Sequence, residues 1–133
     1  MITAYFDGGS RGNPGPAGYG AYIVDDDGTV LAELSGALGI ATNNVAEYNG
    51  LIAALQWAAD QDLTALTVKG DSLLLIEQMR GNYKVKNEGL RPLYHRAKML
   101  VMQIGNVRFE HVRRDLNAEA DRLSNVGMDA NVT

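Results

Sequence analysis

The 133-residue sequence predicts an α/β fold: a five-stranded mixed sheet, with its first three strands antiparallel, flanked by helices. Two observations indicate this fold. Short runs of residues alternate between apolar and polar, and from residue 42 onwards other segments repeat their apolar residues at helical spacing. In chain order the patterns give three strands, a helix, a strand, two helices, a strand and a last helix. We expect a single domain over residues 1–133, since this length and 46% hydrophobic content suit one core.

The first three strands are predicted within residues 2–38. Residues 2–7 alternate and lead into Asp7, which is typical of a strand with one buried face. Residues 19–38 hold two β-rich runs around a DDDG turn, the pattern of a hairpin. The glycine-rich segment between these regions is interpreted as a turn.

The later elements are predicted at residues 42–61 (helix), 63–70 (strand), 72–81 (helix), 90–105 (helix), 106–112 (strand) and 118–130 (helix). Helix starts are indicated by polar residues that can cap them: Thr42 or Asn43, Ser72, and Asn117. Pro92 falls in a first helical turn, where its missing N–H costs little. Trp57 and the methionines at 99, 102 and 128 have helical core spacing and are interpreted as packing residues.

The composition excludes several classes of protein. The chain has no cysteine, so a disulfide-linked partner, a thiolate metal site and a cysteine nucleophile are excluded. It also has no apolar run near the roughly 18 residues that cross a bilayer, and its start lacks the pattern of a signal peptide. We therefore expect no membrane partner and a cytoplasmic location, with a monomer as the expected state.

Charge is distributed unevenly along the chain, whose net charge is −4. Residues 1–79 carry ten acidic and two basic residues, whereas residues 80–133 carry ten basic and six acidic ones. Half of all basic residues lie between Arg80 and Lys98. This run is either an ordinary solvated helix face or part of a surface for nucleic acid.

Four acidic residues stand at positions that a purely structural chain would avoid. Asp7 and Asp71 each end a predicted strand, which brings them together if the first and fourth strands are neighbours. Glu47, predicted in the first turn of its helix, shares a face with apolar residues and so points toward the sheet. Asp121 is predicted in the first turn of the last helix. The helix dipole alone would explain Glu47 or Asp121 singly, but not four converging acids.

Converging carboxylates indicate a cation, because like charges in a partly buried cleft raise one another's pKa. Oxygen ligands without cysteine or histidine favour Mg²⁺, with Mn²⁺ as a possible substitute. Four carboxylates can hold two such ions, an arrangement that stabilises the attacking and leaving oxygens of a phosphodiester. We therefore expect a metal site of Asp7, Glu47, Asp71 and Asp121 that acts on nucleic acid.

The glycines after Asp7 fit this hypothesis. Backbone without side chains lets a nucleic-acid strand approach closely, and its N–H groups can donate to phosphate or ribose. The residues expected to make these contacts are Gly8, Gly9, Ser10 and Arg11.

Several motifs together resemble the ribonuclease H type 1 family. The segments YFDGGSRGNPGPAGYG, TNNVAEYNGL, KGDS and NAEADRL occur in that family's order and spacing over nearly the whole chain. The resemblance implies a five-stranded ribonuclease H-like fold and an endoribonuclease that cleaves the RNA strand of RNA–DNA hybrids, leaving a 5′-phosphate and a 3′-hydroxyl. The family's metal-binding acids fall on the four acids named above, and Glu47 is also expected to meet a ribose 2′-hydroxyl.

The resemblance also implies contacts with the hybrid at Asn13, Thr42 and Asn43. Turn chemistry for Asn13 and helix capping for Thr42 are equally good explanations of those two residues. The short link near residues 81–89 resembles family members that lack a basic protrusion. Lys84 and Lys86 remain there as a reduced grip on phosphate, so we expect modest affinity that falls with salt.

Many family members carry a histidine in a loop after the fifth strand, where this chain reads FEHVRRDLN. His111 is a nominal match, but the alternation places it inside the strand. We interpret His111 as structural and Arg114, or Arg113, as the loop residue that holds the scissile phosphate or the product.

Two other functions remain open at this point. One is a non-catalytic module that binds hybrids, since fold alone does not determine function. The other is a different nuclease or strand-transfer enzyme of the same fold. The sequence also leaves open whether residues 1–133 are a whole protein or one domain of a longer chain.

Overall fold

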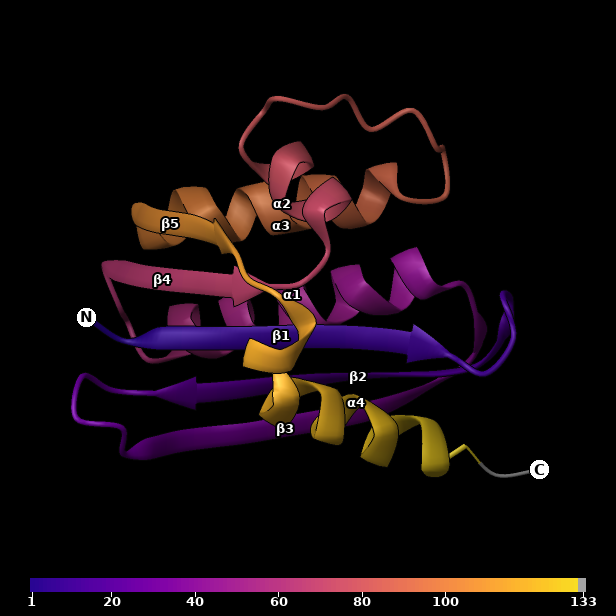
Figure 1. Cartoon of the computed structure of the whole chain (residues 1–133). Helices are drawn as coiled ribbons and strands as arrows, with labels where there is room; N and C mark the ends of the chain where they lie inside the picture. Colours follow the sequence, from indigo (N-terminus) through magenta and orange to yellow (C-terminus); the bar gives the residue numbers. More distant parts are fainter. Residues whose placement is uncertain (132–133) are drawn as a thin grey trace.

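The computed structural model describes residues 1–131 (Figure 1). Its strands are β1 (Thr3–Ser10), β2 (Gly15–Val24), β3 (Val30–Ala41), β4 (Ala65–Gly70) and β5 (Asn106–His111). Its helices are α1 (Asn43–Asp60), α2 (Leu73–Met79), α3 (Arg91–Ile104) and α4 (Ala118–Asp129), with a short 3-10 turn at Arg114–Leu116. Element order and type agree with the sequence prediction.

The five strands form one mixed sheet in the order β3-β2-β1-β4-β5. β1 pairs antiparallel with β2, and β2 pairs antiparallel with β3, as predicted. β4 runs parallel to both β1 and β5. The assumption that the first and fourth strands are neighbours is therefore confirmed.

β1 is longer than predicted. It continues past Asp7 to Ser10, because its pairing with β2 extends through Gly8 with Tyr19 and on to Ser10 with Ala17. β2 accordingly begins at Gly15, so the turn between the two strands is much shorter than the glycine content indicated. Asp7 is thus an interior residue of its strand, and the prediction that it ends the strand is wrong.

The neighbouring strands β1 and β4 stay paired for only part of their length. Their parallel register runs from Thr3 with Thr67 to Tyr5 with Lys69, two residues before Asp7. β4 then ends at Gly70, and Asp71 follows at once. The two acids therefore lie where β1 and β4 separate.

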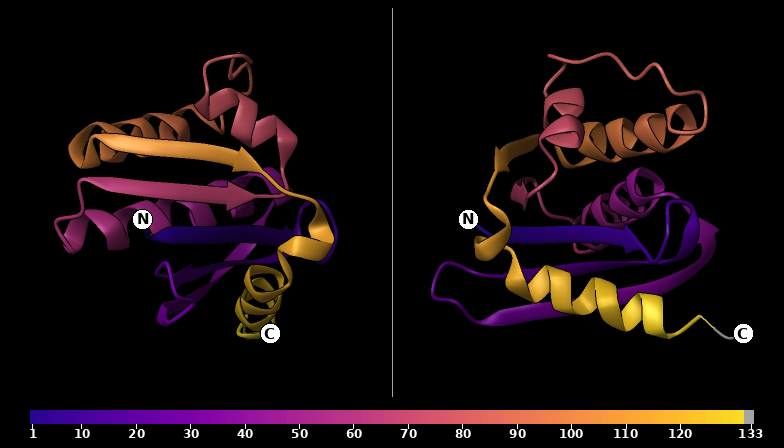
Figure 2. Two further views of the ribbon diagram at one scale, coloured as in Figure 1. Left: turned by 60° about the vertical axis from the view of Figure 1, so that its left-hand side comes forward. Right: turned by 45° about the vertical axis from the view of Figure 1, so that its right-hand side comes forward.

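Helices α1 and α4 pack on opposite faces of the sheet (Figures 1 and 2). A Cβ atom on Gly8 would lie 2.2 Å from the Ala46 carbonyl carbon in α1, and one on Gly20 would lie 2.5 Å from the Ser124 nitrogen in α4. Side chains at these positions would push the helices off the sheet. Close helix packing, rather than an approaching nucleic-acid strand, is what requires glycine at Gly8.

The main core lies between the sheet and α1, with α3 packed against α1. α3 turns Ala97, Leu100 and Ile104 inward. Met99 and Met102 lie on its outer side, 71% and 80% exposed, so the prediction that they pack in the core is wrong. Within residues 1–131, none of the helices has the length and apolar character needed to cross a membrane.

Candidate active site

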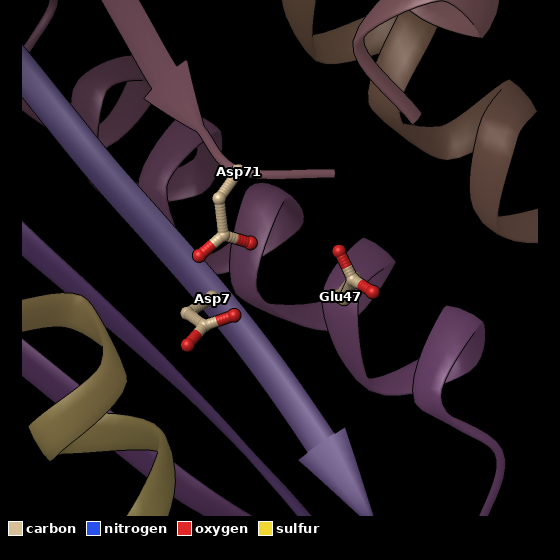
Figure 3. A group of neighbouring side chains, drawn as sticks. All are labelled: Asp7, Glu47 and Asp71. Carbon is tan, nitrogen blue, oxygen red and sulfur yellow. The ribbon is translucent and has the colours of Figure 1, made fainter. Parts of the chain in front are cut away.

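Three carboxylates from separate elements meet beside the point where β1 and β4 separate (Figure 3). Asp7 comes from β1, Asp71 follows β4, and Glu47 comes from α1. One oxygen atom of each lies within 4.8 Å of those of the other two. The predicted convergence of these three acids is therefore present in the structure.

Asp7 is the most deeply buried of the three, with 8% of its surface exposed. Burial, followed by the nearby charge of Asp71, raises the pKa of Asp7 from 3.8 to about 8. This value of the pKa also includes a lowering effect of the Gly8 N–H and smaller raising effects of a hydrogen bond with Asp121 and of the Glu47 charge. The fold thus makes a lone negative charge at Asp7 unfavourable.

Glu47 lies in the second turn of α1, not in the predicted first turn, because the helix begins at Asn43. Burial raises the pKa of Glu47 to about 7, and the charge of Asp71 acts in the same direction. A hydrogen bond from Ser72 and the positive charge of Arg114 partly offset this rise in pKa. Its position on the inward side of the helix agrees with the sequence prediction.

Asp121 lies in the first turn of α4, as predicted, and shares one hollow with the other three acids. The hollow has a volume of about 590 Å³. We call it the acidic cleft; it is lined by Asp7, Gly8, Gly9, Ser10, Arg11, Asn13, Asn43, Asn44, Glu47, Asp71, Arg114, Asp121, Ser124, Asn125 and Met128. All four predicted metal-binding acids are therefore in one place.

The donor set of the acidic cleft fits a hard divalent cation. Its four acids supply carboxylate oxygens, and three of these oxygens are close enough to share one ion. The raised pKa values of Asp7 and Glu47 show how unfavourable the uncompensated charges are. A bound cation would remove that penalty by favouring the ionised carboxylates.

Four further residues of the acidic cleft were missed by sequence reasoning. They are Asn44, Ser124, Asn125 and Met128. The last three stand three, four and seven positions after Asp121, so helical spacing from that acid could have found them. Asn44 directly follows a predicted contact residue but gave no separate signal.

Most of the predicted contact residues line the acidic cleft, but Thr42, Lys84 and Lys86 are not in its lining. Thr42 caps α1, with its hydroxyl oxygen accepting a hydrogen bond from Val45 N at 3.2 Å. Lys84 and Lys86 are exposed on the irregular segment between α2 and α3. The capping interpretation of Thr42 is confirmed.

The turn after β1 is fastened to the start of α1 by two asparagines. Asn13 Oδ1 accepts a hydrogen bond from Asn43 N at 3.1 Å. Asn43 Oδ1 in turn accepts one from Ser10 N at 2.8 Å. These bonds fix one wall of the cleft. Arg11, in the same turn, pairs with Asp129 at 2.5 Å.

The three candidates for the auxiliary role lie at different positions. His111 lies within β5, as predicted, and is its last residue; its Nε2 lies 3.3 Å from the Asp71 carbonyl oxygen. Arg113 is exposed and pairs with Asp115 at 3.0 Å. Arg114 lines the acidic cleft, where its charge lowers the pKa of Glu47. Arg114 is therefore the one of the three placed beside the carboxylates.

Asn117 occupies the N-cap position of α4, as predicted. The residue precedes the helix, but within residues 1–131 its side chain makes no capping hydrogen bond. Its Nδ2 instead donates to the Phe6 carbonyl oxygen and to Asp71 Oδ2. The chain direction at this junction turns the amide toward the sheet and the acidic cleft.

Comparison with known proteins first places the chain in a broad class of proteins, those described as reverse transcriptase-like. A family model described as reverse transcriptase-like matches residues 5–127. A bifunctional protein of Mycobacterium tuberculosis is 54% identical over 125 residues, which cover 93% of this chain but 34% of that protein. Ribonuclease HI of Halobacterium salinarum is 43% identical over 96% of this chain and 64% of its own length. The chain thus spans about a third to two thirds of these relatives.

Similar solved structures narrow this class to the ribonucleases H. The N-terminal RNase H domain of the mycobacterial protein superimposes with a TM-score of 0.93 and 52% identity, covering 97% of this chain and 94% of that one. LC11-RNase H1, solved with an RNA/DNA hybrid, gives a TM-score of 0.92 and 42% identity, covering 97% of each chain. The chain belongs to the ribonuclease H type 1 family.

Proposed function

We propose that this protein is an endoribonuclease that hydrolyses the RNA strand of RNA–DNA hybrids with divalent metal ions. The observation that carries this proposal is the meeting of Asp7, Glu47 and Asp71 within 4.8 Å in the acidic cleft. Asp121 lines the same cleft and completes the four acids. A relative solved with an RNA/DNA hybrid, at 42% identity, supports the choice of substrate.

The four acids would hold two Mg²⁺ ions, with Mn²⁺ as a substitute. Bound divalent ions supply a water-derived nucleophile and stabilise charge on the attacking and leaving oxygens. In the balanced reaction, the water oxygen bonds to phosphorus, the bond from phosphorus to the 3′ oxygen breaks, and a proton passes to that oxygen. The products are a 5′-phosphate and a 3′-hydroxyl.

Other residues of the acidic cleft bind and orient the hybrid in this proposal. Arg114 supplies a cation for the scissile phosphate or the product. Glu47 accepts a hydrogen bond from a ribose 2′-hydroxyl, which distinguishes RNA from DNA. The contact residues of the turn and of the α1 start are Gly8, Gly9, Ser10, Arg11, Asn13, Thr42 and Asn43.

Lys84 and Lys86 extend the binding surface outside the cleft. Both are exposed, and the segment from residue 80 to 90 contains no helix. We propose that they contact backbone phosphates at a distance from the chemistry, as in family members without a basic protrusion. The monomeric state and the cytoplasmic location inferred from the sequence stay predictions.

The proposal is tested by incubating end-labelled RNA–DNA hybrid, double-stranded RNA and double-stranded DNA with the protein and Mg²⁺ or Mn²⁺. We expect cleavage of the RNA strand of the hybrid alone. The products should be extended by poly(A) polymerase, which requires a 3′-hydroxyl. Binding of hybrid without cleavage in either metal would leave a non-catalytic module, and cleavage of DNA duplex would favour another nuclease of this fold.

A further inference from the structure

Asn117 is a buried polar residue at the junction of three elements that carry acids. Its side chain is 1% exposed. Nδ2 donates to the Phe6 carbonyl oxygen at 2.9 Å and to Asp71 Oδ2 at 3.3 Å. Phe6 immediately precedes Asp7 in β1, so one amide group bonds to β1 and to the residue that directly follows β4.

The main chain of Asn117 reaches a further acid. Its carbonyl oxygen accepts a hydrogen bond from Asp121 N at 3.0 Å, the first turn of α4. Asn117 thus bonds directly to Asp71 and Asp121 and to the neighbour of Asp7.

The orientation of the Asn117 amide is determined by its surroundings. The Phe6 carbonyl and the Asp71 carboxylate are both acceptors, so only the NH₂ group can face them. This leaves Asn117 Oδ1 buried with no hydrogen-bond partner among residues 1–131. A buried acceptor without a partner is unfavourable for folding.

Among the residues that the structure describes, Asn117 also does not make the side-chain capping bond that is usual for an asparagine before a helix. An asparagine before a helix usually caps it with its side-chain oxygen, and within the described residues no such bond is made here. A side chain that neither caps its helix nor satisfies its own oxygen is poorly explained by stability. Both losses follow from pointing the amino group at the Phe6 carbonyl oxygen and at Asp71.

We propose that Asn117 is a positioning residue that holds the Asp71 carboxylate in the orientation needed to bind a divalent cation. In this proposal the amide holds Oδ2, and the other Asp71 oxygen is left to bind the cation together with Asp7 and Glu47. Groups that orient a metal ligand in this way commonly change metal affinity 10- to 100-fold when removed. This inference rests on the proposed function, since it deepens the account of the same metal site.

The test compares Asn117→Leu with a matched control, Gln78→Leu. Leucine has nearly the shape of asparagine but no donor. Gln78 is also a buried amide, 4% exposed, and accepts a hydrogen bond from Tyr48 Oη at 2.6 Å within the core. Mg²⁺ binding is measured by titration calorimetry on each folded protein, with its thermal unfolding recorded alongside.

We expect Asn117→Leu to lower Mg²⁺ affinity about 10-fold or more. Gln78→Leu should lower the unfolding temperature but keep the affinity of the parent protein. Cleavage by Asn117→Leu should recover toward the parental kcat as Mg²⁺ is raised, because the loss lies in metal binding. Equal Mg²⁺ affinity in Asn117→Leu and the parent protein would overturn the proposal.

A second measurement uses the unaltered protein and covers the case in which Asn117→Leu does not fold. The side-chain ¹⁵N–¹H signals of Asn117 should shift on Mg²⁺ addition, because the Asp71 carboxylate that accepts from them through Oδ2 becomes a metal ligand through its other oxygen. Unmoved signals at saturating Mg²⁺ would overturn the inference. Neither binding measurement needs substrate, so a protein that binds Mg²⁺ through this arrangement but leaves hybrid uncut would refute the proposed function alone.

Discussion

The acidic cleft and the basic segment from Arg80 to Lys98 differ in the sign of their charge and in how firmly the fold holds their charged residues. The acids of the cleft come from β1, α1, the end of β4 and α4, and packed helices and strands fix their positions. Lys84 and Lys86 of the basic segment are exposed on irregular chain. A single ion requires ligands at defined distances, whereas a polyanion is attracted by charge over a wide area.

Some basic residues of this segment stabilise the fold, and others are the ones proposed to bind nucleic acid. Arg80 donates to the Phe109 carbonyl oxygen at 2.5 Å and pairs with Glu77 at 2.9 Å. Lys98 donates to the Met79 carbonyl oxygen at 3.4 Å. These two cations connect helices to neighbouring elements, so the count of basic residues overstates the surface that can meet nucleic acid.

The largest effect should come from Asp7→Asn. Removing one carboxylate of the cleft weakens the binding of the proposed metal ions. Since such ions supply several kcal/mol of transition-state stabilisation, kcat should fall by at least about 10³-fold. Hybrid cleavage under single-turnover conditions measures this loss. Because asparagine keeps the shape, the folded structure should remain, as circular dichroism would verify; near-normal cleavage would refute the role of the acidic cleft.

Arg114→Ala should have the next largest effect. A hydrogen bond to a charged group contributes about 1.5–3 kcal/mol, so kcat/KM should fall about 10- to 100-fold. His111→Ala, which removes a group beside the Asp71 main chain rather than in the cleft, should change kcat/KM less. The reverse ranking in the same cleavage assay would assign the auxiliary role to His111.

The acidic cleft should also make stability depend on pH when divalent ions are absent. The pKa values of Asp7 and Glu47 are raised to about 8 and about 7 from 3.8 and 4.5, so the folded state favours their protonated forms. Their contribution is fully present below about pH 4 and is lost as pH rises through 7 to 8. In chelator, the unfolding temperature should fall by roughly 10 °C or more between pH 5 and pH 9, because pKa shifts of this size correspond to several kcal/mol.

This pH effect has an internal control in Asp7→Asn, whose unfolding temperature should depend less on pH over the same range. Mg²⁺ should raise the unfolding temperature of the parent protein more at pH 9 than at pH 5, since ionised carboxylates bind the ion. An unfolding temperature that rises with pH in chelator would contradict the assigned burial of these two charges.

The smallest effect should come from the double change of Lys84→Ala and Lys86→Ala. Each lost phosphate contact reduces the slope of log K against log[salt] by roughly 0.7–0.9, so the slope should become shallower by about 1.5. Affinity at low salt should fall severalfold. Fluorescence anisotropy with labelled hybrid over a range of salt measures both quantities, and an unaltered slope would show that these lysines do not contact phosphate.

The acids were predictable from local patterns together with one assumption, that the first and fourth strands are neighbours. Alternation directs the β1 side chains, helical spacing turns Glu47 inward, and strand adjacency brings Asp71 close to Asp7. The length of β1 was not predictable in the same way, because glycine usually indicates a turn. Gly8 belongs to the strand because it pairs with Tyr19 of β2. It is glycine because α1 packs directly on it, a contact between segments distant in sequence.

Asn117 shows where sequence reasoning stops. Its position before α4 correctly indicated a helix start, but the direction of its amide depends on Phe6 and Asp71. These residues are 111 and 46 positions away in the chain. The prediction that Met99 and Met102 are buried was wrong for a related reason. Helical spacing identifies apolar stripes along a helix, but the packing of α3 decides which stripe is covered.

The early end of the pairing between β1 and β4 has a consequence for redesign. If the two strands stayed in register beyond Tyr5 and Lys69, main-chain hydrogen bonds would fill the gap in which the carboxylates now face one another. A longer and more regular sheet would thus close the opening in which the proposed metal ion would bind.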